Sequence, residues 1–184
     1  IYLGLIVWDE LEKIGIKKRE DPKTGLLSLV FSQDELNMIE KLVVVDSIIT
    51  EDGLKGISNL KNLKSLSIER KPMKIKGHRL QSGVYIPQDH YTPQREVSSI
   101  SDRVMSEIER MENLESLSIV GQSKLTSIDV SKLPKLRDLN ISGNMRLQSI
   151  CGLESLQQLN CLTLIGNHEL TEVDGLNQCL NNKQ

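Results

Sequence analysis

Aliphatic residues recur in the second half of the chain with one fixed pattern. Segments 114–119 (LESLSI), 136–141 (LRDLNI) and 159–164 (LNCLTL) carry leucine or isoleucine at their first, fourth and sixth positions. Their starting points give successive steps of 22 and 23 (136 − 114 and 159 − 136). A period near 22 with an LxxLxL core predicts a solenoid in which each repeat lays one strand beside the last.

The pattern extends toward the N-terminus. Segments 39–44 and 63–68 carry Ile/Leu/Val and Leu/Leu/Ile at matching positions, with a step of 24 between them (63 − 39). In the links between the repeated segments, such as 147–159, apolar residues recur every three positions. A step of three matches the 3.0 residues per turn of a 3₁₀ helix, so we expect 3₁₀ turns on the convex side of the stack.

An amide side chain follows each of the three regular segments. Gln122, Asn144 and Asn167 lie three residues after the last aliphatic position of their repeats. At a sharp bend after a strand, a side-chain amide can satisfy backbone groups that would otherwise lack a partner, at a cost of about 1 to 3 kcal/mol if they were buried unpaired. We therefore interpret these amides as structural and not as a ligand site.

The first segment, 1–38, does not follow the repeat and is expected to cap the N-terminal end of the core. Alternating aliphatic residues at 14–16 and 27–31 flank the turn-forming stretch 20–25 (EDPKTG), which predicts a β-hairpin. Ser32 with Glu35 forms a capping-box pattern before Leu36. The first repeats then occupy 39–68.

The rhythm breaks in an irregular insertion at 69–112. The step from Leu63 to Leu114 is 51 (114 − 63), so either one repeat carries a long extra segment or two repeats fit, with a degenerate strand near 84–86. Residues 69–93 are charged and interrupted by proline and glycine, as loops are. Residues 99–111 are predicted to be a helix, because Ile100, Val104, Ile108 and Met111 share one face, with Ser99 and Asp102 as a capping box.

Regular repeats fill 113–184, and the end of this segment lacks a next strand. One period beyond Leu159 falls on Asn182, where the pattern requires leucine. The last core layer would be open unless a partner, a missing segment or self-association through this end covers it. We expect the native polypeptide to continue beyond these residues.

Composition narrows the classes of partner. Aromatic residues make up only 3% of the chain and the formal net charge is −2. Stacking platforms for bases are therefore scarce, and nothing in the net charge attracts nucleic acid or an anionic membrane. No apolar run approaches the ~20 residues of a membrane span; residues 1–8 are hydrophobic but short, and a removed signal peptide is compatible with a chain that begins without Met.

Residues with catalytic or metal-binding chemistry are few and scattered. His78 and His90, with Asp89, lie in the insertion, and His168 follows Asn167 at a variable, exposed position. The cysteines at 151, 161 and 179 lack the CxxC spacing of zinc sites and are interpreted as free thiols. The chain contains no GxSxG, HExxH or phosphate-loop motif, so we expect neither an enzyme nor a cofactor or metal.

The concave sheet is the main candidate for binding. Because side chains alternate along a strand, the residues between the buried aliphatics point outward. The predicted partner-binding face consists of Ser116, Ser118, Val120, Asp138, Asn140, Ser142, Cys161, Thr163 and Ile165.

A second candidate is a basic cluster in the insertion. Its members are Arg70, Lys71, Lys74, Lys76 and Arg79. With Tyr85 and Tyr91 nearby, such a cluster can hold phosphates or an acidic protein, although charge runs are more often solvated loops.

From residue 31 to about 180 the chain resembles the short-repeat bacterial leucine-rich repeat proteins of the internalin and surface-antigen type. The resemblance rests on residues 54–63 (LKGISNLKNL) and 124–132 (KLTSIDVSK). It implies recognition of proteins through the concave sheet, and it favours an extracellular or cell-surface location over the cytoplasm.

The expected fold is an α/β leucine-rich repeat solenoid, with a parallel sheet on the concave face, mostly 3₁₀ turns and one α-helix on the convex side, and the hairpin cap. The expected function is non-catalytic binding of a partner macromolecule, most readily a protein. Two alternatives remain: a regulatory or targeting segment of a larger enzyme, and anion or nucleic-acid binding through the basic insertion.

Overall fold

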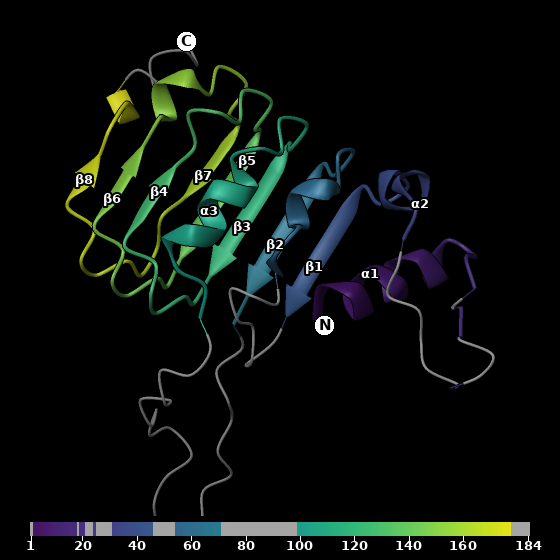
Figure 1. Ribbon diagram of the computed structural model, residues 1–184. Coiled ribbons are helices and arrows are strands. Elements are labelled where there is room, and N and C mark those ends of the chain that lie inside the picture. Colours follow the sequence, from purple (N-terminus) through teal and green to yellow (C-terminus); the bar gives the residue numbers. More distant parts are fainter. Residues whose placement is uncertain are drawn as a thin grey trace, which may run out of the picture.

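The repeated segments form two parallel sheets that lie in separate layers. A computed structural model describes residues 2–17, 19–20, 24, 31–45, 54–70 and 99–177. The larger sheet has the order β1-β2-β3-β5-β7 and the smaller one β4-β6-β8 (Figure 1). The larger sheet consists of β1 (Lys41–Val45), β2 (Ser65–Glu69), β3 (Ser116–Val120), β5 (Asp138–Ser142) and β7 (Cys161–Thr163).

The leucines of successive repeats occupy equivalent positions in the larger sheet. Leu117 is paired with Leu139, and Leu139 with Leu162, in parallel register. The register continues through β1 and β2, where Leu42 pairs with Leu66 and Leu66 with Leu117. All of these leucines except Leu162 are at most 1% exposed. The predicted stack, with aliphatic interiors shared between neighbouring layers, is confirmed.

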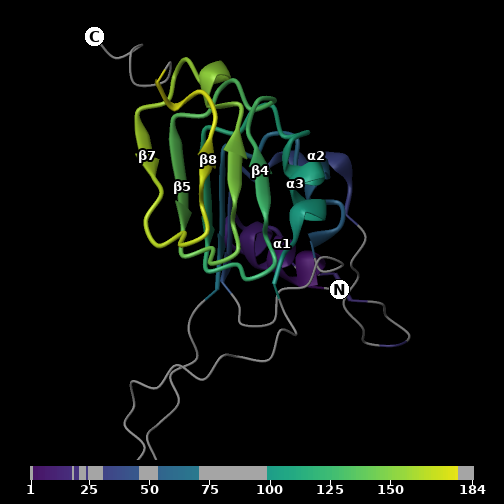
Figure 2. The same ribbon diagram turned by 90° about the vertical axis from the view of Figure 1, so that its left-hand side faces the viewer.

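The opposite layer combines short strands with 3₁₀ turns. The 3₁₀ helices η2 (Ile57–Asn59) and η3 (Leu153–Ser155) lie in links where a three-residue rhythm predicted them. Other parts of the links form β4 (Ser127–Asp129), β6 (Ser149–Cys151) and β8 (Glu172–Val173) instead. Stacking of successive repeats places these segments side by side, and their backbones then pair, which the three-residue rhythm did not reveal (Figure 2).

A glycine allows the turn between β6 and η3. Gly152 has φ of 87°, and a Cβ placed there would overlap the backbone of Ser131 in the preceding repeat. Glycine adopts this conformation without steric cost and also permits the close approach.

The insertion lies within a single repeat. β2 pairs directly with β3 along its full length, from Ser65 with Ser116 to Glu69 with Val120. No strand separates them in this sheet, so of the two arrangements left open by the sequence, the one long repeat is correct. Residues 71–98, including the proposed degenerate strand, lie outside the described residues.

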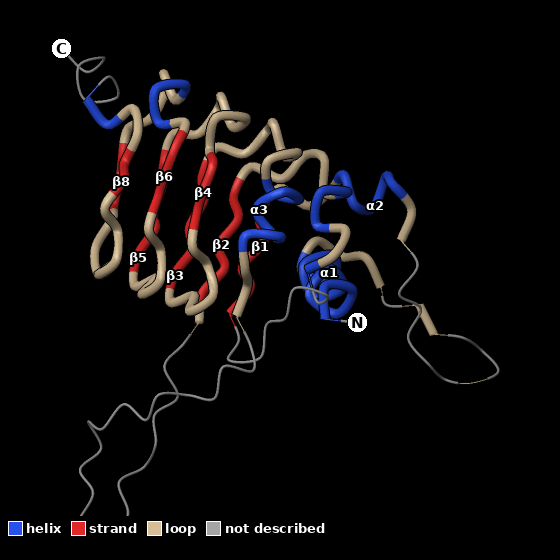
Figure 3. The backbone as a smooth tube through the Cα atoms, turned by 60° about the vertical axis from the view of Figure 1, so that its left-hand side comes forward, coloured by secondary structure: helices blue, strands red, loops and turns tan. Residues whose placement is uncertain are grey.

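The predicted helix follows the insertion and packs on the convex side. α3 (Asp102–Ile108) buries Val104, Met105 and Ile108 and contacts η2 and β4 (Figure 3). It therefore lies in the layer that β4, β6 and β8 form in later repeats. It is shorter than the predicted 99–111, since Ser99 and Ile100 precede it and Met111 follows it.

The predicted capping box of Ser99 and Asp102 is wrong. Ser101 is the N-cap, and its hydroxyl accepts from the Arg103 amide. The Ser99 hydroxyl instead accepts from the amides of Ser123 and Lys124. The helical pattern located the α-helix, but tertiary partners in the next repeat compete for these polar side chains.

The Asp102 carboxylate ties α3 to the start of β4. It accepts hydrogen bonds from the amides of Thr126 (2.8 Å) and Ser127 (3.2 Å) and from the Thr126 hydroxyl. Burial by itself would raise the pKa of this carboxyl, but the hydrogen bonds from Thr126 and Ser127 outweigh burial and hold the pKa below its usual value.

The N-terminal cap contains a helix that the repeat pattern did not predict. α1 (Tyr2–Lys13) lies beside β1, at the end of the stack opposite β7 (Figure 1). It buries Val7, Trp8 and Leu11, an i, i+1, i+4 spacing typical of a helix face. Trp8 packs edge-on against Phe31, with ring centroids 5.0 Å apart. A terminal helix thus closes the core over β1.

The predicted hairpin lies largely outside the described residues. Ile14 lies in a turn directly after α1 and is 50% exposed, so the first arm does not begin there as a strand. Residues 25–30, most of the second arm, are not described. The Ser32 and Glu35 capping box is confirmed at the start of α2 (Gln33–Asn37).

The core is less enclosed in the last repeat. The aliphatic residues there are only partly buried: Leu162, Leu164, Leu170, Val173 and Leu176. Their equivalents one repeat earlier are at most 1% exposed: Leu139, Ile141, Leu147, Ile150 and Leu153. The stability that each layer contributes should therefore differ along the stack.

We predict that equivalent leucines contribute unequally to the free energy of unfolding. Leu117→Ala, in an enclosed layer, should reduce the free energy of unfolding by about 2 to 5 kcal/mol. Leu162→Ala, in the half-open layer, should cost about 1 to 2 kcal/mol because less apolar area is lost. Urea titrations followed by circular dichroism measure both, and equal losses would contradict the gradient of burial.

We also predict an acid-dependent contribution from Asp102. Its lowered pKa means that its stabilisation is fully present above the usual value of 3.8 and is lost as pH falls from there through the folded-state pKa. Asp102→Asn should cost about 1 kcal/mol at pH 7, a modest value because the group is partly solvated. Urea titrations at pH 7 and at successive values below pH 3.8 should show the full difference from wild type at pH 7 and a difference that shrinks as the pH falls.

Candidate functional site

One face of the larger sheet points away from the core. Buried and more exposed residues alternate along β1, β2, β3 and β5, as the pleat requires. We call the outward side of these strands and β7 the open face. Strand pairing arranges its side chains in rows that cross the sheet.

All members of the predicted binding face lie on or beside this surface. Pairing aligns Ser116 with Asp138 and Cys161, then Ser118 with Asn140 and Thr163, and Val120 with Ser142. Ile165 lies beyond the end of β7 and is 75% exposed. Its carbonyl accepts from the Gly143 amide at 2.8 Å, so the row register continues past the strand.

Residues of the first two strands complete the same rows. None of them was predicted as a site residue, although the regular spacing of 39–44 and 63–68 carried the necessary signal. They are Lys41, Val43, Val45, Ser65, Ser67 and Glu69.

Polar side chains near the middle of the open face bond to one another. The Asn140 amide nitrogen donates to Ser118 Oγ at 3.1 Å, and the Ser142 hydroxyl donates to Asn140 Oδ1. The Ser67 hydroxyl donates to Glu69 Oε1 at 2.8 Å. These short side chains are held in place, which leaves a surface with little conformational entropy to lose on binding.

Exposed aliphatic residues lie on β1 and near the carboxyl ends of the other strands. Val43 and Val45 on β1 are each 38% exposed, and Ile165 is the most exposed large hydrophobic residue described. Val120 lies between them on β3 and is partly exposed. The open face is thus polar at the centre of β2, β3 and β5, and mildly apolar on β1 and toward the carboxyl ends of the strands.

Charged residues of alternating sign precede the strands. We call Glu40, Lys64, Glu115 and Arg137, which directly precede β1, β2, β3 and β5, the strand-start row. Lys64 Nζ lies 2.9 Å from Glu40 Oε1, and Arg137 Nε lies 3.9 Å from Glu115 Oε2. The hydrogen bond to Glu40 and the charge of Glu40 raise the pKa of Lys64.

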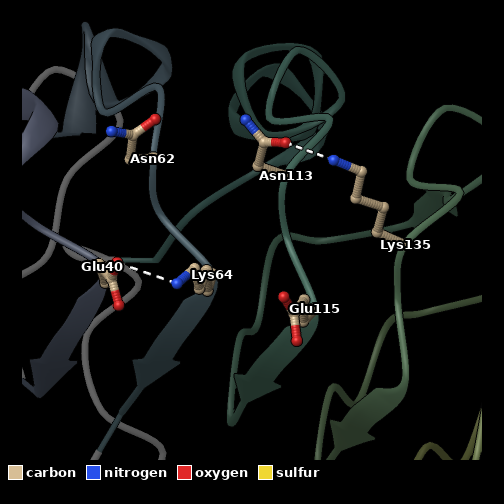
Figure 4. A pocket seen from close by; sticks show the side chains of 6 residues that line it. All are labelled: Glu40, Asn62, Lys64, Asn113, Glu115 and Lys135. Carbon is tan, nitrogen blue, oxygen red and sulfur yellow. Dashed lines mark hydrogen bonds and ion pairs between the residues drawn. The ribbon is translucent and has the colours of Figure 1, made fainter.

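A shallow groove of about 230 Å³ lies along the first three members of this row, Glu40, Lys64 and Glu115. Asn62, Asn113 and Lys135 complete its lining, and Lys135 Nζ donates to Asn113 Oδ1 at 2.7 Å (Figure 4). Asn62 and Asn113 in turn donate to the backbone carbonyls of Asn37 and Lys61. The groove is a by-product of stacked turns, and its polar groups largely serve the chain itself.

Most of the predicted basic cluster is not described by the structure. Lys71, Lys74, Lys76 and Arg79 lie outside the described residues, as do His78, Asp89 and His90. Arg70 directly follows β2; its amide donates to the Val120 carbonyl and its guanidinium to Ser123 Oγ at 3.2 Å. Anion binding by the cluster stays a prediction.

The three amides after the strands form a structural ladder, as predicted. Asn144 is fully buried; its Oδ1 accepts from the Gln122 amide at 2.9 Å, and its Nδ2 donates to the Ile119 carbonyl at 3.0 Å. Asn167 repeats both contacts one layer further, to the Asn144 amide and the Ile141 carbonyl. Each asparagine therefore secures the bend of the preceding repeat.

Gln122 stands where its neighbours have asparagine, and its partners explain the difference. Its Oε1 accepts from the Ile100 amide at 3.1 Å and from the Ser99 hydroxyl at 3.3 Å, at the point where the chain returns from the insertion. Ile100 therefore occupies the ladder position of the preceding repeat. The extra methylene lets the ladder reach a backbone displaced by the insertion.

Other candidate chemistry is dispersed. Cys161 is exposed on the open face, and Cys151 is a partly buried free thiol whose pKa is raised by burial. His168 is exposed, as expected, and Cys179 lies outside the described residues. Within the part of the chain that the structure describes, no three His, Cys, Asp or Glu residues gather as a metal site. None of the helices described is long and apolar enough to cross a membrane.

Parallel strands in register, aliphatic layers shared between repeats, and an amide ladder define a leucine-rich repeat solenoid. The resemblance seen in residues 54–63 and 124–132 is therefore confirmed for the fold. No protein-family model matches the sequence, and no curated protein matches it significantly.

The solved structures that are similar to this chain include two bacterial proteins. One is a leucine-rich repeat protein of Leptospira interrogans, with 20% identity and a TM-score of 0.46, covering 76% of this chain and 27% of that one. The other is an internalin of Listeria monocytogenes, with 20% identity and a TM-score of 0.49, covering 93% of this chain and 48% of that one. This chain thus spans less than half the length of either.

We predict that Gln122→Asn disconnects the ladder from the insertion. The shorter side chain cannot reach the Ile100 amide, which is left buried and unpaired at a cost of about 1 to 3 kcal/mol. Hydrogen exchange of the Ile100 amide should accelerate, and the urea midpoint should fall. Gln157→Asn, at an exposed position, serves as the control and should change neither; unaltered exchange at Ile100 in Gln122→Asn would exclude this role.

Proposed function

We propose that this chain is a non-catalytic scaffold that binds a partner protein through the open face. One observation supports the proposal above the others: the strands of the larger sheet, paired in register, present a continuous surface, and at its centre Ser118, Asn140 and Ser142 hydrogen-bond to one another. Parallel stacking makes this surface wide, and the shared core beneath it makes it rigid.

The chemistry of the open face fits a protein surface better than a small molecule. Serine, threonine and asparagine side chains offer donors and acceptors without forming an enclosed cavity, whereas small-molecule sites are concave and mostly apolar. Val43 and Val45 on β1, and Ile165 beyond the end of β7, add exposed apolar area to this face. Burial of such side chains against a partner contributes about 25 cal/mol per Å² of apolar area removed from water.

The resemblance noted in the sequence supports the same use, since leucine-rich repeat proteins of this type commonly recognise proteins through this sheet. The proposed location is outside the cell or at its surface, which rests on that resemblance alone.

The test is capture of proteins by variants that differ only on the open face. Asn140→Arg with Thr163→Arg places two long charged side chains in one row of β5 and β7 and should abolish binding by steric and electrostatic conflict. The immobilised wild type and variant are compared for proteins retained from extracts and surface fractions of the source organism.

A matched control places the same side chains elsewhere. Gln148→Arg with Thr171→Arg alters exposed residues that directly precede β6 and β8 in the smaller sheet. This control should retain what the wild type retains. Equal retention by the open-face variant would remove the open face from consideration.

A further inference from the structure

The strand-start row has a symmetry that a single chain does not use. Read from β1 to β5, its charges are negative, positive, negative and positive, at Glu40, Lys64, Glu115 and Arg137. A row of this kind is complementary to its own reverse. Within one chain, Glu40 pairs with Lys64 and Glu115 with Arg137, so the two ends of the row, at β1 and β5, never meet.

The next row shows the same symmetry, and its end charges form no salt bridge among the residues that the structure describes. Lys41, Ser65, Ser116 and Asp138 are aligned by strand pairing, with a cation at one end and an anion at the other. Both ends are exposed. They are three strands apart, about 14 Å, which is too far for a direct pair. Nothing in the described part of the chain forms a salt bridge with either side chain, so pairing among these residues does not explain their signs.

The centre of this arrangement is small and uncharged. Ser65 and Ser116 lie between the two charged ends, and Ser67 and Ser118 lie beside them in the following row. Short hydroxyl side chains at the centre permit close approach of a second surface and can exchange hydrogen bonds across it.

We propose that the strand-start row, together with the adjacent row of the open face (Lys41, Ser65, Ser116 and Asp138), pairs with a second copy of this chain, about a two-fold axis that runs parallel to the strands between β2 and β3. This inference rests on the proposed function, because it names one protein that the open face takes up. The axis sets β1 against β5 of the second copy and β2 against β3. Glu40 then faces Arg137, Lys64 faces Glu115 and Lys41 faces Asp138, each pair occurring twice.

A two-fold contact of this kind is isologous, so each favourable pair is duplicated. The exposed ion pairs of each chain become parts of larger charge networks. Such networks can stabilise a complex, whereas isolated surface ion pairs add little to its stability. The row of Val45, Glu69, Val120 and Ser142 lacks this complementarity. The contact is therefore confined to the half of the face near the strand starts.

The expected association is weak and sensitive to salt. Strands about 4.8 Å apart, each contributing about 10 Å of its length, give a patch of roughly 200 Å² on each copy. The total for both copies, about 400 Å², is well below the roughly 1,200 Å² of total buried area in stable complexes. Charges at the rim of such a patch are screened over about 10 Å at 0.1 M salt. We expect a reversible dimer at high protein concentration and low ionic strength.

Charge exchange at the two ends of the strand-start row tests the pairing. Arg137→Glu alone and Glu40→Arg alone each place like charges opposite one another at both ends of the contact. Either change should weaken self-association at least tenfold in sedimentation velocity between about 10 µM and 1 mM protein. The double variant restores opposite charges across the axis and should regain most of the association.

The double variant separates this pairing from a merely structural role. Within one chain it makes positions 40 and 64 both cationic and positions 115 and 137 both anionic. Intrachain effects therefore predict that the double variant is worse than either single variant, whereas two-fold pairing predicts rescue. Lys132→Glu, which breaks an exposed pair with Glu109 beside α3, is the matched control and should not alter association.

Two results would overturn the second-copy inference. One is a wild type that stays monomeric up to 1 mM protein in 20 mM salt. The other is a double variant that self-associates no more strongly than the single variants. Neither result would argue against the proposed binding of other proteins by the open face, because the variants of Asn140 and Thr163 test that binding independently. Circular dichroism spectra of all variants establish that they are folded.

Discussion

Lateral pairing of equivalent backbone segments from successive repeats holds every layer of this molecule in place. Pairing sets Leu117, Leu139 and Leu162 at the same level, so that each aliphatic layer is covered by the next. It also brings the Asn144 side chain to a place where it reaches two backbone groups of the preceding repeat. A repeat alone buries too little apolar area to offset the entropy of ordering its backbone, so the fold exists only as a stack.

The insertion shows how strictly this constraint is kept. A long segment enters between β2 and α3, yet β2 and β3 remain paired in the same register as their neighbours. Polar side chains secure the return of the chain: Gln122 accepts from Ile100, Ser99 accepts from the following repeat, and Asp102 accepts from the start of β4. The insertion is accommodated because these side chains rebuild the contacts that a normal link would supply.

The same constraint governs which surface is available for recognition. Aliphatic side chains are committed to the shared interior, and the amides after the strands are committed to the bends. What remains outside is the alternate set of strand residues, which stacking gathers from distant parts of the sequence into rows. A binding surface thereby arises from the fold without any local cluster of unusual residues.

Local periodicity was enough to predict the repeat, the identity of the core leucines and the structural role of the amides, because the same short pattern recurs in each layer. Helical spacing likewise located α3. It did not reveal α1, since the nearly continuous apolar run of residues 1–8 obscures a helical face, and Ser101 forms the cap that the spacing assigned to Ser99. The smaller sheet, the single long repeat, the partners of Gln122 and the row shared by Lys41 and Asp138 emerged only from the folded chain. Each of these depends on which segments become neighbours although they lie one or more repeats apart, and the pairing energies that select them are absent from any short window of the sequence.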